Sequence, residues 1–346
     1  MDNGWANIAK NLMKSQKLKY CSAPEILHER CDSRIIDAHT LSKSLSLRPI
    51  ASNGVVMSVN TNPFTLNEQN GVLTFTKTGI SKASVFTGFC AYHDKHIFSP
   101  IENTLFYPSA ENLFLQAYRI SCMEYFKKSL IVKNQYKLRN EFNSQLKELK
   151  KERNDDDLKT KEKIIKSILS EKERHEKQGL SDTGKIKKKL DEIYLSKSFS
   201  RLRHKVFEVE NNKVVTGASI LIEIDFYNNK LQNLNDYNQD QFIIFNCIST
   251  SKDKGFIFFS WLQENSLAEK LIKSLMEKEN KEDLLVEFFY SYSENTYSNP
   301  EWWDSLSSDT KNVLSSKLNE VNSSSRDLSR PRKKYDAFKI ISHFDL

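Results

Sequence analysis

The spacing of hydrophobic and polar residues divides the chain into four sections. In residues 1–20, apolar side chains recur at helical spacing, which predicts a short N-terminal helix whose apolar face holds Trp5, Ile8, Leu12 and Met13. In residues 21–130 the pattern is mixed. Apolar and polar residues alternate at 54–59 and at 71–76, which predicts two strands separated by a loop. Ser109 is the predicted N-cap of a helix with one face formed by Phe114, Tyr118, Cys122 and Tyr125.

The last two sections differ sharply in composition. Residues 131–200 carry a thin apolar stripe between Lys- and Glu-rich faces, which predicts long helices broken near 154–157 and 179–184. The pattern of residues 201–346 predicts a strand at 220–226 and a β-hairpin formed by 242–247 and 256–261. It then predicts helices at 266–290 and 309–321, a flexible connector at 326–334 and an edge strand at 337–341. We therefore expect an α+β protein with a charged helical hairpin between an N-terminal module and a C-terminal sheet packed with helices.

Composition excludes several classes of protein. Hydrophobic residues make up 38% of the 346 residues, which is enough for sizeable cores and argues against global disorder. The nearest approach to a P-loop, at residues 179–185, continues with Ile186 and lacks the hydroxyl that binds Mg²⁺. The opening residues lack the apolar core of a signal peptide, and the apolar stretch 255–262 is too short to cross a bilayer. We expect a cytoplasmic protein with no membrane partner.

Charge is concentrated in the third section. The chain has a net charge of +7, and residues 133–192 alone hold 18 Lys and Arg against 13 Asp and Glu. This distribution permits a DNA or RNA partner without requiring one. The same helices are also a candidate surface for a protein partner or for self-association through residues 131–200.

Cysteine and histidine residues cluster between positions 21 and 96. This stretch holds seven of the twelve Cys and His residues of the chain, and Cys90 and His93 form a Cys-x2-His turn in which two side chains can point at one ion. Cys21 and Cys31 supply a second pair, with His28 as an alternative ligand beside Cys31. We predict a structural zinc site at Cys21, Cys31, Cys90 and His93. The alternative is that the cysteines are small core residues and the histidines lie on the surface.

The order of these residues resembles the HNH, or ββα-metal, nucleases. His39 follows the apolar pair Ile35 and Ile36, so we expect it at the end of a strand, after the first cysteine pair and before the Cys90 turn. In that family a histidine at a strand end, placed between two zinc-binding turns, is the general base for phosphodiester hydrolysis, and a divalent ion stabilises the leaving oxygen. The resemblance covers residues 21 to about 100.

The resemblance implies roles for three further residues. His39 would be the base, and Asp94 or His96 would hold a catalytic ion such as Mg²⁺. Ala38 stands where the family usually has an acidic ligand, so a degenerate relative that only binds nucleic acid is a second interpretation. The leading hypothesis is a metal-dependent endonuclease or such a relative, with bacterial phage defence as a weak analogy. The alternative is a non-enzymatic, zinc-stabilised scaffold that binds partners through its helices.

Two other features complete the picture. Residues 79–94 and 294–303 are similar to uncharacterised bacterial proteins of similar length, which implies a bacterial, cytoplasmic protein and no particular activity. Glu223 and Asp225 alternate on the predicted strand 220–226 and would share a face. Such a pair can hold Mg²⁺ but more often marks the solvent face of a strand.

Overall fold

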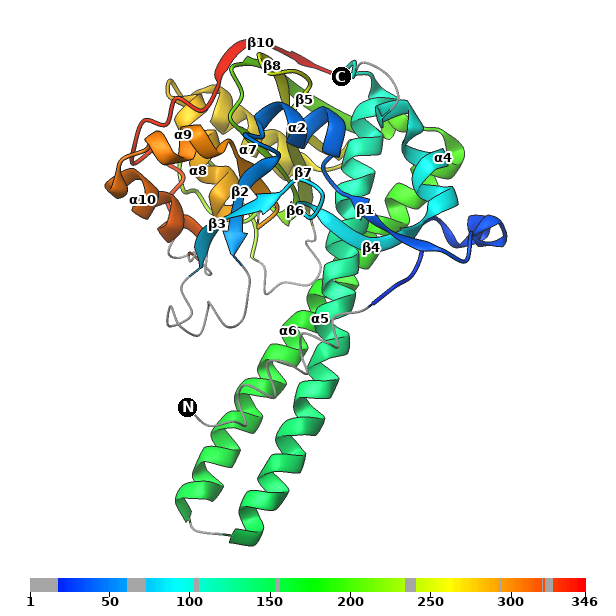
Figure 1. Ribbon diagram of the computed structural model, residues 1–346, viewed down its shortest axis with the longest axis vertical. Coiled ribbons are helices and arrows are strands. Elements are labelled where there is room, and N and C mark those ends of the chain that lie inside the picture. The colour runs from blue at the N-terminus through cyan, green and yellow to red at the C-terminus, as the bar shows by residue number, and fades with distance from the viewer. Residues whose placement is uncertain are drawn as a thin grey trace.

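A computed structural model gives the fold of residues 18–60, 73–102, 106–152, 156–233, 241–292, 294–318, 320 and 326–346. The predicted α+β class is confirmed, with a sheet, surrounding helices and a long helical hairpin (Figure 1). The predicted N-terminal helix lies almost wholly outside the described residues.

An eight-stranded antiparallel sheet forms the centre of the globular body. Its strand order is β10-β5-β8-β7-β6-β9-β2-β3. The strands are β2 (Val55–Asn60), β3 (Thr74–Gly79), β5 (Leu202–Glu210), β6 (Val214–Leu221), β7 (Phe242–Ser249), β8 (Lys254–Leu262), β9 (Thr296–Ser298) and β10 (Lys339–Asp345). The hairpin β7–β8 and the edge strand β10 confirm two predictions from the sequence. Because β3 pairs with β2 and β2 pairs through β9 with β6, the sheet includes residues from the predicted second section, 21–130.

Both faces of the sheet are covered, which explains the continuous apolar runs in β7 and β8. Successive side chains of a strand point to opposite faces. Ile244 and Phe258 therefore join the core under the helical hairpin, whereas Phe245 and Phe259 join the core on the other face. That second core is covered by α7 (Ser266–Met276), α8 (Lys281–Tyr292), α9 (Pro300–Ser305) and α10 (Ser308–Leu318).

The helical hairpin consists of α5 (Ala110–Glu152) and α6 (Asp156–Ser196), whose outer parts project from the body (Figure 1). Ser109 caps α5 as predicted, since its Oγ accepts a hydrogen bond from the Asn112 N–H at 3.2 Å. The predicted break at 179–184 is wrong, because α6 runs through both glycines. A Cβ at Gly179 or at Gly184 would lie 3.3 Å from a side chain of α5, so the glycines allow close helix packing instead of a turn.

Three local predictions in the C-terminal section need correction. The strand predicted at 220–226 ends at Leu221, because Asp225 accepts hydrogen bonds from the N–H groups of two following residues and turns the chain. The single helix predicted at 266–290 is two helices, α7 and α8. The predicted connector at 326–334 is packed against the body: Leu328 is buried, and Arg332 N donates to Glu287.

A smaller two-stranded sheet lies beside the hairpin. It pairs β1 (Ile35–His39) with β4 (Val85–Cys90) in antiparallel register, and α4 (Ala91–Glu102) begins directly after β4. The remaining short elements are η1 (Glu25–Arg30), η2 (Lys43–Leu47), α2 (Arg48–Ile50) and η3 (Phe199–Arg201). The small sheet, α4 and the segment around η1 contain the predicted zinc ligands and His39, Asp94 and His96, whereas Glu223 and Asp225 lie after β6.

Candidate metal centre and the surroundings of His39

Four side chains from three segments meet at one point. The Nδ1 atom of His93 lies 3.5 Å from Cys21 Sγ, 3.4 Å from Cys31 Sγ and 3.2 Å from Cys90 Sγ. All four donor atoms lie within 4.8 Å of one another. His28, the alternative ligand, instead places its Nε2 2.8 Å from the carbonyl oxygen of Ala23.

Local structure explains how the two pairs meet. Cys90 is the last residue of β4 and His93 lies in the first turn of α4, so their side chains are three residues apart on one helical face. The chain before η1 runs along β4, where Ser22 N donates to Gly88 O at 2.8 Å and places Cys21 beside Cys90. The short 3-10 helix η1 then returns the chain, so Cys31 completes the group.

The chemistry of this group fits a shared cation. Cys21, Cys90 and His93 are buried, and one imidazole nitrogen cannot accept a hydrogen bond from three thiols at once. Burial and the neighbouring sulfurs of Cys21 and Cys90 raise the pKa of Cys31 to about 12, so the thiolates need a positive charge among them. Three sulfurs and one imidazole are a typical ligand set of zinc. The group can therefore bind a metal ion such as zinc.

Comparison of the chain with protein-family models, with curated proteins and with solved structures finds no match.

His39 lies at the end of β1, as predicted, opposite Val85 of β4. Its Nε2 is 3.2 Å from the carbonyl oxygen of Ile80. A carbonyl oxygen only accepts, so Nε2 carries the proton and Nδ1 is the basic nitrogen of the neutral ring. Burial lowers the pKa of His39; Lys43 and Arg119 lower it further, against the opposing effect of the Ile80 carbonyl. The ring is therefore neutral at pH 7.

Ser84 ties the turn that carries the Ile80 carbonyl to the end of β1. Its carbonyl oxygen accepts from Thr40 N at 2.7 Å, and its Oγ accepts from Leu41 N at 3.0 Å. From the large sheet, the hydroxyl of Tyr297 lies 2.6 Å from Ser84 N and accepts its hydrogen bond. Ser84 also has a φ of 57°, a strained backbone for a residue other than glycine. The backbone around His39 is thus fixed from two sides.

Asp94 lies on the face of α4 that packs against α5. Its Oδ1 is 3.7 Å from Arg119 Nη2, and Arg119 Nη1 donates to Glu102 at 2.8 Å. The guanidinium is buried, with its central carbon 3.9 Å from the centre of the Phe98 ring. Burial raises the pKa of Asp94, and Arg119 opposes this rise. Asp94 Oδ1 is buried without a hydrogen-bond partner.

His96 faces elsewhere. It is exposed, its ring stacks on Tyr92 at 3.9 Å, and its Nδ1 donates to Tyr92 O at 2.7 Å. Over the described ranges, His39, Asp94 and His96 do not form a second group of metal ligands like the one at Cys21.

Arg119 and Ser84 contribute to the site but were not predicted from the sequence. Arg119 is the one charged residue between Leu113 and Met123, an otherwise largely apolar stretch of a predicted helix. That pattern is a signal for a buried ion pair, although it does not identify the partner. Nothing in the sequence marks Ser84, because its role depends on Tyr297, which is 213 residues away.

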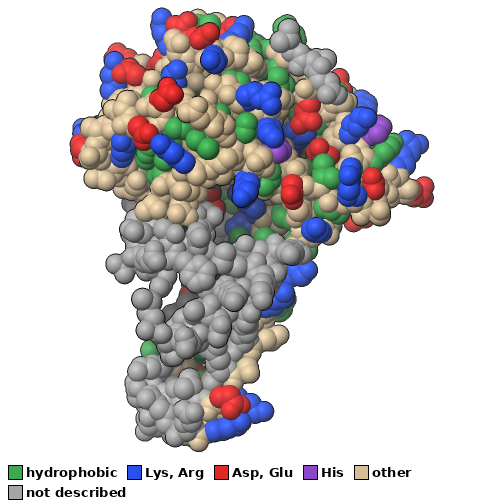
Figure 2. Space-filling view, viewed as in Figure 1, with side chains coloured by type: hydrophobic (Ala, Val, Ile, Leu, Met, Phe, Trp, Pro, Cys, Tyr) green, Lys and Arg blue, Asp and Glu red, His purple; other side chains and the backbone are tan. Residues whose placement is uncertain are grey.

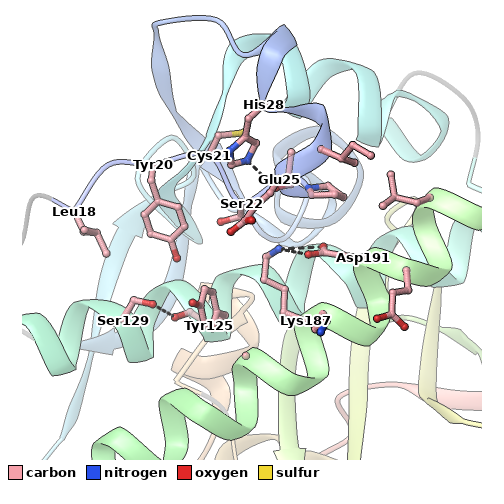
Figure 3. A pocket seen from close by; sticks show the side chains of 17 residues that line it. Leu18, Tyr20, Cys21, Ser22, Glu25, His28, Tyr125, Ser129, Lys187 and Asp191 are labelled. Atoms are coloured by element: carbon pink, nitrogen blue, oxygen red, sulfur yellow. Dashed lines mark hydrogen bonds and ion pairs between the residues drawn. The ribbon is translucent and has the colours of Figure 1, made fainter.

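The helical hairpin supports the segment that carries Cys21 (Figure 3). Lys187 Nζ lies 2.7 Å from Asp191 Oδ2, and the hydroxyl of Tyr118 donates to Asp191 Oδ1 at 2.6 Å. Lys187, Asp191 and Ser22 line a pocket of about 720 Å³ between this segment and the two helices α5 and α6. Burial opposes a charged Lys187, but Asp191 and Cys122 raise its pKa above the ordinary value, so the ion pair is retained.

Surface charge and helix hydrophobicity are relevant to the nucleic-acid and membrane partners considered from the sequence. On the face seen in Figure 2, basic and acidic side chains are interspersed over the globular body. No helix of the described ranges is both long enough and apolar enough to cross a membrane.

Proposed function

We propose that this chain is a zinc-stabilised, metal-dependent nuclease of HNH-like type, with His39 as the general base. The ion at Cys21, Cys31, Cys90 and His93 is structural in this proposal, because four protein ligands leave no open position. It joins the segment before η1 to the junction of β4 and α4. Since β1 pairs with β4, the same ion supports the strand that ends at His39.

The observation that carries the proposal is the orientation of His39. The Ile80 carbonyl fixes the tautomer, and the lowered pKa leaves Nδ1 unprotonated near neutral pH. Such a nitrogen can take a proton from the water that attacks a phosphodiester. A divalent ion bound nearby would stabilise the charge on the leaving oxygen. Asp94 is its candidate ligand, because Oδ1 has no hydrogen-bond partner. The alternative ligand, His96, is turned to Tyr92.

The test is nicking of plasmid DNA and cleavage of RNA with Mg²⁺, Mn²⁺ or Ni²⁺. His39→Ala should abolish cleavage, whereas His175→Ala, an exposed histidine of α6, should retain it. Activity should fall toward acid pH with a midpoint below the ordinary histidine pKa of about 6.5. Absence of cleavage, together with absence of salt-sensitive binding to either nucleic acid, would reject the proposal. Salt-sensitive binding without cleavage would identify the degenerate relative.

A second candidate function is an interaction protein that uses the helical hairpin. The observation that favours it is the projecting pair of helices, joined by ion pairs between Arg139 and Glu173 at 2.7 Å and between Lys150 and Glu162 at 2.7 Å. A rigid charged arm can bind a protein partner or a second copy. In that case light scattering or pull-down would detect the complex, and His39→Ala would leave it intact.

A further inference from the structure

The turn that holds the ring of His39 connects the two sheets. Residues 80–84 run from the end of β3, in the large sheet, to the start of β4, in the small one. At the β3 end, Ile80 N donates to Gly54 O at 3.0 Å, and the carbonyl oxygen of Ile80 accepts from His39 Nε2 at 3.2 Å. The orientation of the His39 ring therefore depends on how this turn is held between the two sheets.

Ser84 closes the other end of the turn in a backbone conformation that its surroundings have to fix. Its φ of 57° lies in the left-handed region, which is unfavourable for a residue other than glycine. Ser84 is buried, so each of its polar groups needs a partner within the protein. Two partners follow the end of β1, because Thr40 N donates to Ser84 O and Leu41 N donates to Ser84 Oγ. These bonds join the turn to the strand that carries His39.

The other two partners of Ser84 come from the large sheet. Ser84 N donates to the hydroxyl of Tyr297, a residue of β9, at 2.6 Å, and Ser84 Oγ donates to Asn295 Oδ1 at 2.9 Å. Tyr297 and Asn295 are both buried. Each is itself held in place, since β9 pairs with β2 and with β6, and Asn295 Nδ2 donates to Gly217 O at 3.3 Å. Ser84 is therefore anchored to the centre of the body by residues more than 200 positions further along the chain.

We propose that Tyr297 and Asn295 are positioning residues for His39. By holding Ser84, they fix the turn in which the Ile80 carbonyl accepts the proton of Nε2. The basic nitrogen, Nδ1, then keeps one direction relative to the small sheet. Both residues act through Ser84 and the Ile80 carbonyl, and not by contact with a substrate. The importance of this direction for cleavage rests on the proposed function, whereas the positioning itself does not.

The first test is nuclear magnetic resonance of the ¹⁵N-labelled full-length chain at neutral pH. A ring N–H that is hydrogen-bonded and shielded exchanges slowly with water, so Nε2–H of His39 should give a resolved signal, which His39→Gln assigns by removing it. Tyr297→Phe keeps the buried ring but leaves the Ser84 N–H without its acceptor, so the signal should broaden or disappear. Tyr227→Phe, at an exposed tyrosine, should leave the signal unchanged.

The second test is the kinetics of nucleic-acid cleavage. Tyr297→Phe should lower kcat about ten- to a hundredfold and leave KM nearly unchanged, because a misplaced base weakens proton transfer and not substrate binding. Ser84→Ala keeps the N–H bond to Tyr297 but loses both bonds of Oγ, so a smaller effect in the same direction is expected. Circular dichroism of each variant verifies that it is folded.

Four results would overturn the positioning role: no Nε2–H signal in the wild-type chain, a signal that persists in Tyr297→Phe, an equal loss in Tyr227→Phe, or a wild-type kcat in Tyr297→Phe. The two proposals fail separately. A wild-type chain that cleaves neither nucleic acid rejects the nuclease, whereas loss of the signal in Tyr297→Phe but not in Tyr227→Phe supports the positioning role even then.

Discussion

Arg119 offers a quantitative test of the buried ion pairs beside α4. Its guanidinium is 1% exposed and faces the carboxylates of Asp94 and Glu102, which are 16% and 31% exposed. Arg119→Met keeps an aliphatic chain against Phe98 but removes the charge. Breaking a buried pair in this way costs about 3 kcal/mol, because a buried carboxylate is left without compensation. Most of this cost falls on Asp94, since Glu102 is accessible to water.

The assay is a double-mutant cycle with Asp94→Asn, measured by urea denaturation followed by circular dichroism at pH 8. The free energy of unfolding lost in the double variant should be about 1–2 kcal/mol smaller than the sum of the losses in the two single variants, since in the double variant neither charge remains buried alone. Without Arg119 the pKa of Asp94 rises further, so the carboxyl takes up a proton in the folded state as pH falls. The loss in unfolding free energy caused by Arg119→Met should therefore become smaller as the pH is lowered from 8 to 5. Additive losses, or a loss independent of pH, would refute the reasoning.

Two further predictions concern the sheet. Gly255→Ala would place a Cβ 2.5 Å from the backbone oxygen of Ile248, so we expect a loss of about 1–3 kcal/mol in urea denaturation, whereas Gly79→Ala, with its nearest neighbour 3.9 Å away, should change stability by less than about 0.5 kcal/mol. Burial lowers the pKa of His204 to about 3, so only the unfolded chain binds its proton near pH 5, and stability should fall by about 2 kcal/mol between pH 7 and pH 5. His204→Gln should flatten this slope and His175→Gln should not; equal slopes would contradict the assignment.

The sequence predicted the features that depend on short-range patterns. Cys90 and His93 are three residues apart, and that spacing alone places two ligands on one turn. The hairpin β7–β8, the cap at Ser109 and the strand end at His39 likewise follow from local alternation and capping.

Other features depend on partners far along the chain. Within the sequence of α6 alone, Gly179 and Gly184 indicate that the helix is interrupted. They are instead explained by α5, because Lys128 and Tyr125 pack so close to these two positions that a residue without a side chain is favoured. The pairing of β2 with β9 joins residues about 240 positions apart, and alternation within either strand carries no information about it. For the same reason Asp94 could be recognised as a candidate ligand, but its pairing with Arg119 could not be predicted.

The metal content of the purified chain tests the central claim most directly. Elemental analysis should find about one zinc per wild-type chain, and Cys90→Ser should lose it because a closed four-ligand site tolerates no missing ligand. Cys247→Ser, a substitution in the core of the sheet, should retain the metal. A wild-type chain expressed with ample zinc that contains none, or a Cys90→Ser chain that keeps it, would contradict the account.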